Sequence, residues 1–122
     1  MKESQEHELI CEYMKNKYPD VIFLSDASGL KMTIGQAVKW AKLKSHKGIP
    51  DIIILAPRKG YHGLMIELKK TGTKIQKKNG EWKDEHITQQ AYVLSRLESE
   101  GYLSGFCIGY DDAIQTIDDY LM

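Results

Sequence analysis

The spacing of apolar and polar residues changes several times along the chain, and each change marks a predicted element. Apolar residues recur at helical spacing in four segments, which predicts helices over residues 4–17, 33–48, 86–101 and 111–122. Short apolar runs bounded by turn residues predict strands over residues 21–26, 51–55, 63–69 and 103–109. This order of elements predicts an α/β fold in which helices flank a mixed central sheet on both faces.

The two most hydrophobic runs, "DIIIL" and "GLMIELK", lack the alternation of a half-exposed strand. Continuous apolar runs are typical of central strands that are covered on both faces, so we expect both here. Residues 70–85 have no sustained periodicity but contain Asn79-Gly80, which predicts a mobile basic loop or a hairpin. Trp82 near the end of this segment, like Trp40, is expected to pack rather than to stack on a base.

Length and composition bound the organisation of the protein. A chain of 122 residues with 42% hydrophobic residues fits one domain over residues 1–122, and no repeat or linker interrupts it. The first ten residues contain no apolar signal region, and no run approaches the roughly 18 apolar residues of a membrane span. Cys11 and Cys107 lie in apolar settings without partners at metal-ligand spacing, which favours reduced thiols. We therefore expect a soluble cytoplasmic protein that does not interact with membranes.

Charge is unevenly distributed although the formal net charge is zero. Residues 31–83 contain 13 Lys or Arg but only three acids, Asp51, Glu67 and Glu81, so the middle of the chain is basic and its ends are acidic. A basic segment of this size can bind a polyanion such as nucleic acid whatever the overall charge. The lysines between residues 31 and 47 are equally compatible with a solvated helix face.

Three charged residues stand at the ends of the most hydrophobic strands. Asp51 opens the first strand, and Glu67 and Lys69 project from one face at the end of the second, 16 and 18 residues later. If the strands pair, Asp51 lies beside Glu67, and two adjacent carboxylates repel unless a cation or a shared proton separates them. Carboxylate ligands suit Mg²⁺ or Mn²⁺, which would activate a water beside the Lys69 ammonium.

The first helix contributes a further acid. Glu6 precedes Leu9, Ile10 and Tyr13 at helical spacing, so it shares their inward face, where an unpaired carboxylate would be costly. The histidines show no recognisable ligand spacing and are expected to be structural or solvated: His7, His46, His62 and His86.

A Glu-x-Lys pair on a strand is usually an ordinary ion pair, but its combination with "GIPD" 16 residues upstream follows the PD-(D/E)xK nuclease pattern. With "MIELKK" and the helix "ITQQAYVLSRLESEG", the chain resembles a stand-alone VRR-NUC domain of the phage or bacterial type along nearly its whole length. The resemblance implies a restriction-endonuclease-like core of the PD-(D/E)xK superfamily.

The resemblance also implies roles for individual residues. Asp51, Glu67 and the Leu68 carbonyl would bind Mg²⁺ or Mn²⁺, Lys69 would serve the water, and Gln90 would support the site from the following helix. Glu6 would be the helix-borne acid and metal ligand, with Glu8 as the alternative if the helical register differs.

The sequence therefore favours a metal-dependent DNA endonuclease that hydrolyses phosphodiester bonds. No sequence-reading module is recognisable, so cleavage directed by DNA structure is expected. The resemblance points to a homodimer that acts on branched DNA in the manner of a Holliday-junction resolvase. A flap or nicking nuclease of the same fold, or a non-catalytic DNA-binding subunit, are the alternatives.

Overall fold

The computed structural model describes residues 2–26 and 32–122. It contains four helices, α1 (Glu3–Lys17), α2 (Ile34–Lys42), α3 (Glu85–Ser99) and α4 (Gly109–Leu121), and four strands, β1 (Phe23–Ser25), β2 (Ile52–Ile54), β3 (Leu64–Lys69) and β4 (Leu103–Ile108). The strands form one sheet in the order β1-β2-β3-β4. Both pairings of β2 are antiparallel, whereas β3 and β4 are parallel. The predicted α/β fold with a mixed sheet is confirmed.

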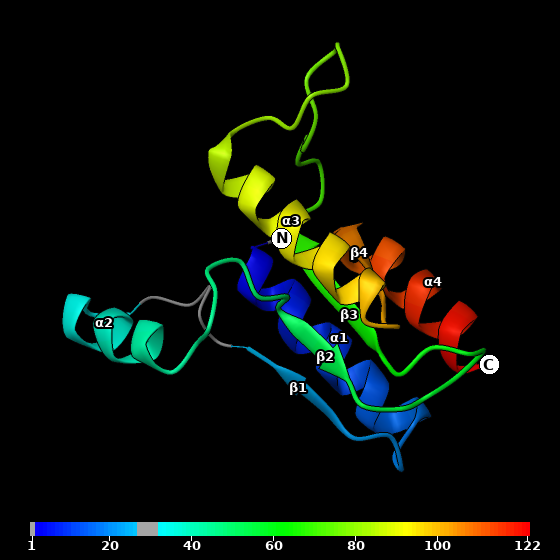
Figure 1. Cartoon of the computed structure of the whole chain (residues 1–122). Coiled ribbons are helices and arrows are strands. Elements are labelled where there is room, and N and C mark those ends of the chain that lie inside the picture. The colour runs from blue at the N-terminus through cyan, green and yellow to red at the C-terminus, as the bar shows by residue number, and fades with distance from the viewer. Residues whose placement is uncertain (1, 27–31) are drawn as a thin grey trace.

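Helices lie on both sides of this sheet (Figure 1). On one side α1 and α4 pack on each other and on the sheet, and α3 packs on β3 and β4 from the other side. The main core fills the layer between the sheet and α1 with α4, where Ile10, Ile52, Ile66 and Ile117 are fully or almost fully buried. Alternation along β2 and β3 sends every second apolar side chain into this layer.

Two expectations about the middle of the chain need correction. The helix predicted over residues 33–48 ends at Lys42, because the chain turns at Leu43 and reaches Gly48 with a positive φ of 81°. The prediction that both apolar strands are covered on both faces holds for β3 but is wrong for β2, where Ile53 is only half-buried and Leu55, just beyond the strand, is exposed. The physical reason is that α3 packs on β3 and β4, away from β2.

The basic segment after β3 is a hairpin, one of the two conformations that its sequence suggests. Gln76 and Trp82 form an antiparallel bridge, the Lys77 amide donates to the Glu81 carbonyl at 2.8 Å, and the turn lies at Asn79-Gly80. The hairpin projects from the body of the protein next to the N-terminus of α3 (Figure 1). Trp82 packs against Phe106 with ring centroids 5.5 Å apart, as expected for a packing role.

Both cysteines are free thiols, as expected. Cys107 lies in the core, and burial raises the pKa of its thiol to about 11, so it stays protonated near neutral pH. Among the described residues, no helix has the length and apolar character needed to cross a membrane.

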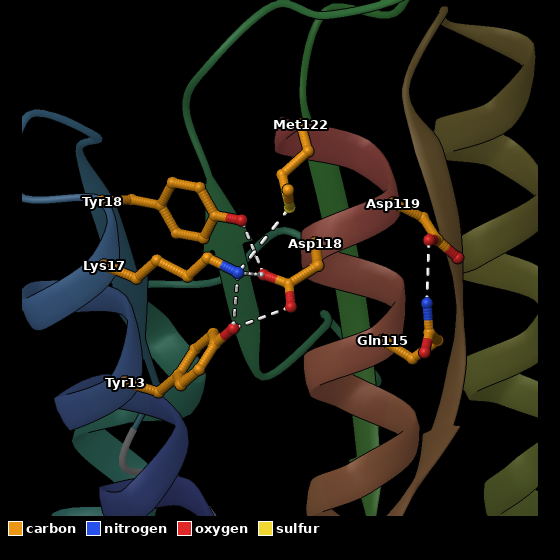
Figure 2. Close-up of polar contacts among 7 residues, drawn as sticks. All are labelled: Tyr13, Lys17, Tyr18, Gln115, Asp118, Asp119 and Met122. Atoms are coloured by element: carbon orange, nitrogen blue, oxygen red, sulfur yellow. Dashed lines mark hydrogen bonds and ion pairs between the residues drawn. The ribbon is translucent and has the colours of Figure 1, made fainter.

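A polar cluster joins the C-terminal ends of α1 and α4 (Figure 2). The Asp118 carboxylate accepts hydrogen bonds from the hydroxyls of Tyr13 at 2.7 Å and Tyr18 at 2.6 Å, and it pairs with Lys17 at 3.2 Å. Partial burial acts to raise the pKa of Asp118, but the bonds from Tyr18, Tyr13 and Lys17 together lower it below its usual value. The charged carboxylate therefore helps to hold α1 against α4.

We expect Asp118→Asn to lower the free energy of unfolding by about 1–2 kcal/mol, since it weakens two hydrogen bonds to a charged acceptor and removes an ion pair. Chemical denaturation at pH 7 measures this change. Asp119→Asn is the matched control, because the Asp119 carboxylate bonds only to the exposed Gln115 amide among its described partners (Figure 2). Equal losses in the two variants would contradict a specific role for Asp118.

Candidate active site

Antiparallel pairing brings the predicted strand-end residues together. Asp51 directly precedes β2, and Glu67 and Lys69 lie at the end of β3, so the pairing of Ile52 with Ile66 places them at the same edge of the sheet. The Leu68 amide donates to Asp51 Oδ2 at 3.0 Å. This bond fixes the Asp51 carboxylate against the end of β3.

Glu67 is the most perturbed acid at this edge. Its side chain is only 2% exposed, and burial, a hydrogen bond with Asp51 and the Asp51 charge raise its pKa to about 10. Lys69 opposes this rise but is outweighed. Without a cation, Glu67 is therefore protonated at neutral pH and is hydrogen-bonded to Asp51.

Gln90 of α3 lies beside Gly48, in the loop that leads to Asp51. The Asp84 carboxylate caps this helix by accepting the Ile87 amide at 2.9 Å, and Gln90 is buried one turn later. The loop before Asp51 packs tightly against α3 here. A Cβ on Gly48 would lie 3.2 Å from both the backbone nitrogen and the Cα of Gln90. Glycine at position 48 thus allows both its positive φ and this close approach.

Glu6 is 1% exposed, on the inward face of α1 as predicted. Its Oε1 accepts hydrogen bonds from the Thr71 hydroxyl at 2.8 Å and the Thr71 amide at 3.3 Å, two residues beyond Lys69. Thr71 fits because residue 109 is glycine, since a Cβ there would lie 2.2 Å from the Thr71 hydroxyl oxygen. Glu8, the alternative helix acid, is exposed and lines a shallow hollow with Gln5, Leu9 and Glu12.

Two residues of α1 that the sequence analysis did not assign to the site lie close to Asp51. Ligand atoms of Glu3, His7 and Asp51 all lie within 4.8 Å of one another. His7 Nδ1 is 3.0 Å from the Ser25 hydroxyl of β1, a contact that fixes the imidazole plane. Glu3 and His7 are four residues apart on α1, so the helical spacing signal existed, but nothing in the sequence pairs this face with Asp51.

Buried oxygens without partners mark the same region. Among the described residues, the buried side-chain oxygens that lack a hydrogen-bond partner belong to three predicted site residues: Glu6 Oε2, Glu67 Oε2 and Gln90 Oε1. Leaving such atoms desolvated is costly, so a ligand or a water is needed to satisfy them. An oxygen-rich set with one imidazole suits a divalent cation such as Mg²⁺ or Mn²⁺, so these residues fit a metal centre.

Comparisons with known proteins agree with this geometry. A family model described as "VRR-NUC domain" matches residues 1–110. A solved structure titled "VRR_NUC domain protein" has a TM-score of 0.71 and 23% sequence identity to this chain, with 99% of this chain and 88% of that chain covered. No curated protein matches the chain significantly.

We expect Glu67 to make the metal-free protein less stable as pH rises. The folded state holds a proton on Glu67 up to about pH 10, whereas the unfolded state releases it near 4.5. Between these values the unfolded state binds fewer protons, so the free energy of unfolding falls by at most about 1.4 kcal/mol per pH unit.

Denaturation of wild type and Glu67→Gln in chelator at pH 5, 7 and 9 tests this effect. The variant should gain stability over wild type at each step, since an amide cannot ionise. Glu81→Gln, at an exposed position, should keep a constant difference from wild type. A Glu67→Gln difference that does not change with pH would show that Glu67 has no raised pKa.

Proposed function

Because the chain belongs to the VRR-NUC domain family, a family of nuclease domains, we propose that it is a metal-dependent DNA endonuclease that hydrolyses phosphodiester bonds. The observation that carries this proposal is the buried pair of Asp51 and Glu67 at one edge of the sheet, with Glu67 Oε2 unsatisfied. Two adjacent carboxyls that retain a proton when no cation is present are suited to exchange that proton for Mg²⁺ or Mn²⁺.

Asp51, Glu67 and the Leu68 carbonyl would hold the cation from the sheet. On α1, Glu3 and His7 have ligand atoms within 4.8 Å of Asp51. Glu6 accepts the Thr71 hydroxyl with Oε1, and its Oε2 has no hydrogen-bond partner. We assign ligand roles to Glu3 and His7, and a positioning role to Glu6 through Thr71. A cation bound there would polarise a phosphoryl oxygen and lower the pKa of a bound water.

The remaining site residues act on the water and the phosphate. Lys69 follows Glu67 on the same face of β3, so its ammonium would orient the attacking water and stabilise negative charge on the phosphoryl oxygens. Gln90 Oε1, buried and unpaired, would accept a hydrogen bond from that water or from a ligand of the metal.

The basic hairpin supports binding of the DNA backbone. It starts directly after β3, at the strand end that carries Glu67 and Lys69, and it contains five exposed lysines: Lys70, Lys74, Lys77, Lys78 and Lys83. Lysines that neutralise phosphates supply affinity without reading sequence. We therefore propose cleavage directed by DNA structure, with a four-way junction as the leading substrate.

A junction requires two symmetric cuts, which a two-fold homodimer of a chain with one active site would supply. A flap or nicking nuclease is the alternative within the same chemistry. A non-catalytic DNA-binding subunit is disfavoured by the presence of Asp51, Glu67 and Lys69 together.

We expect Asp51→Asn, Glu67→Gln and Lys69→Ala each to reduce the cleavage rate by about a hundredfold or more, as loss of a key transition-state group does. DNA affinity should fall little, since it comes mainly from the lysines. Single-turnover cleavage and a binding titration in Ca²⁺ separate the two effects. Glu98→Gln, at an exposed position on α3 outside the hairpin, serves as the matched control, and cleavage by Glu67→Gln at the rate of this control would contradict the assignment.

Cleavage should require Mg²⁺ or Mn²⁺, stop in EDTA and remain absent in Ca²⁺, which prefers more ligands and longer bonds. Calorimetric titration with Mn²⁺ in the absence of DNA adds a readout independent of activity. Glu3→Gln and His7→Ala should weaken Mn²⁺ binding about tenfold or more, whereas Glu8→Gln should leave it unchanged. Undiminished Mn²⁺ binding in both variants would exclude the α1 ligands, and cleavage in chelator would exclude metal chemistry.

The wild-type protein should place paired symmetric nicks across a labelled four-way junction. Light scattering coupled to size exclusion should give about 28 kDa, twice the 14.0 kDa of the chain. Comparison with duplex and flap DNA on the same gel measures the preference. A monomer that cuts flaps and ignores junctions would refute the junction assignment and leave the metal chemistry intact.

A further inference from the structure

Helix α2 has an apolar face and makes little contact with the other described elements. Its N-terminus is well formed, since the Thr33 hydroxyl accepts the Gln36 amide at 3.1 Å and the Gln36 side chain accepts the Thr33 amide at 3.0 Å. Ile34, Ala37, Val38 and Ala41 share one side at helical spacing, yet every residue of the helix is exposed, Ile34 to 86%. Figure 1 shows α2 extending away from the sheet.

The sheet has an apolar face that complements this helix. Ile22, just before β1, is 69% exposed, and Leu24, on β1, is 59% exposed and pairs with the half-buried Ile53 of β2. Leu55 extends the same face at 56% exposure. Because α3 packs on β3 and β4, no described helix covers this side of β1 and β2.

Contacts at the base of α2 favour its projection away from its own sheet. Lys44, just after the helix, forms an ion pair with Asp26 at 2.8 Å, and both side chains are largely buried. The Asp26 amide in turn donates to the Asp51 carbonyl at 2.6 Å. This chain of contacts fixes the exit from α2 at the start of β2, next to the proposed metal site and away from Ile22 and Leu55, which pair at the opposite end of the strands.

We propose that α2 packs on the exposed β1–β2 face of a second copy of this chain, and that the second copy returns the same contact. A two-fold exchange covers both apolar faces at once and leaves Lys39, which lies away from Ile34 on the helix, facing solvent or DNA. The dimer itself rests on the proposed function, and this inference identifies its interface.

The exposed apolar area is large enough for this role. Five large side chains contribute to it: Ile22, Leu24, Ile34, Val38 and Leu55. Together they expose on the order of 550 Å² per copy, so a reciprocal exchange would bury about 1,100 Å² in total, which exceeds the roughly 1,000 Å² expected of a specific interface. Exposed apolar patches of this size mark interaction surfaces, and the presence of two complementary patches in one chain favours a second copy over a different partner.

Mass measurement of α2 variants tests the interface without DNA or metal. Light scattering should give about 28 kDa for wild type and for the control Gln36→Glu, on the polar side of α2, and 14.0 kDa for Val38→Glu. Circular dichroism should show the same helix content in all three. A dimeric Val38→Glu would overturn the interface while leaving the dimer standing, and a monomeric wild type would overturn both without affecting the nuclease chemistry.

Disulfide trapping identifies which surfaces meet. In a Cys11→Ser background, a Val38→Cys copy mixed with a Leu24→Cys copy should form a disulfide-linked pair upon oxidation, and Gln36→Cys in place of Val38→Cys should not. If Val38→Cys and Leu24→Cys in one chain instead give an intrachain disulfide and a monomer, α2 covers its own sheet and the proposal fails.

Discussion

The protein is organised around two carboxyl groups that share one buried edge of its sheet. Asp51 and Glu67 lie close enough to exchange a hydrogen bond, and burial keeps the Glu67 pKa near 10. Ionising both groups in this setting without a counter-charge is unfavourable. The surrounding core holds the ends of β2 and β3 together and so keeps the two carboxyl groups adjacent. A bound proton or cation is then needed to offset their repulsion.

Several structural details serve this edge. The Leu68 amide holds Asp51, Gly48 lets the preceding loop lie against α3, and the Thr71 contact with Glu6 ties α1 to the chain just after Lys69. Each brings an element of different sequence position to the same place. The site thus depends on helices from both faces of the sheet, which explains why it is found in a domain built as α/β/α layers.

The two sides of the sheet differ in how completely they are covered. The layer beneath α1 and α4 is a closed apolar core, whereas on the other side α3 covers β3 and β4 and leaves Leu24 and Leu55 exposed. Helix α2, with its own exposed apolar side, has the composition to complete that layer. An assembly of two copies would cover the exposed β1–β2 face of each chain, and it would contain two of the proposed metal sites.

The sequence by itself determined the class of fold and which charged residues stand at the strand ends. Alternation along β3 places Glu67 and Lys69 on one side, and helical spacing buries Glu6, since both periodicities are local properties of the backbone. Tertiary structure decided which helix residues approach Asp51, because the approach of Glu3 and His7 depends on how α1 crosses the sheet. It also decided that β2 is covered on one face only. An apolar run indicates that both faces of a strand favour burial, but it does not indicate which other element packs on each face.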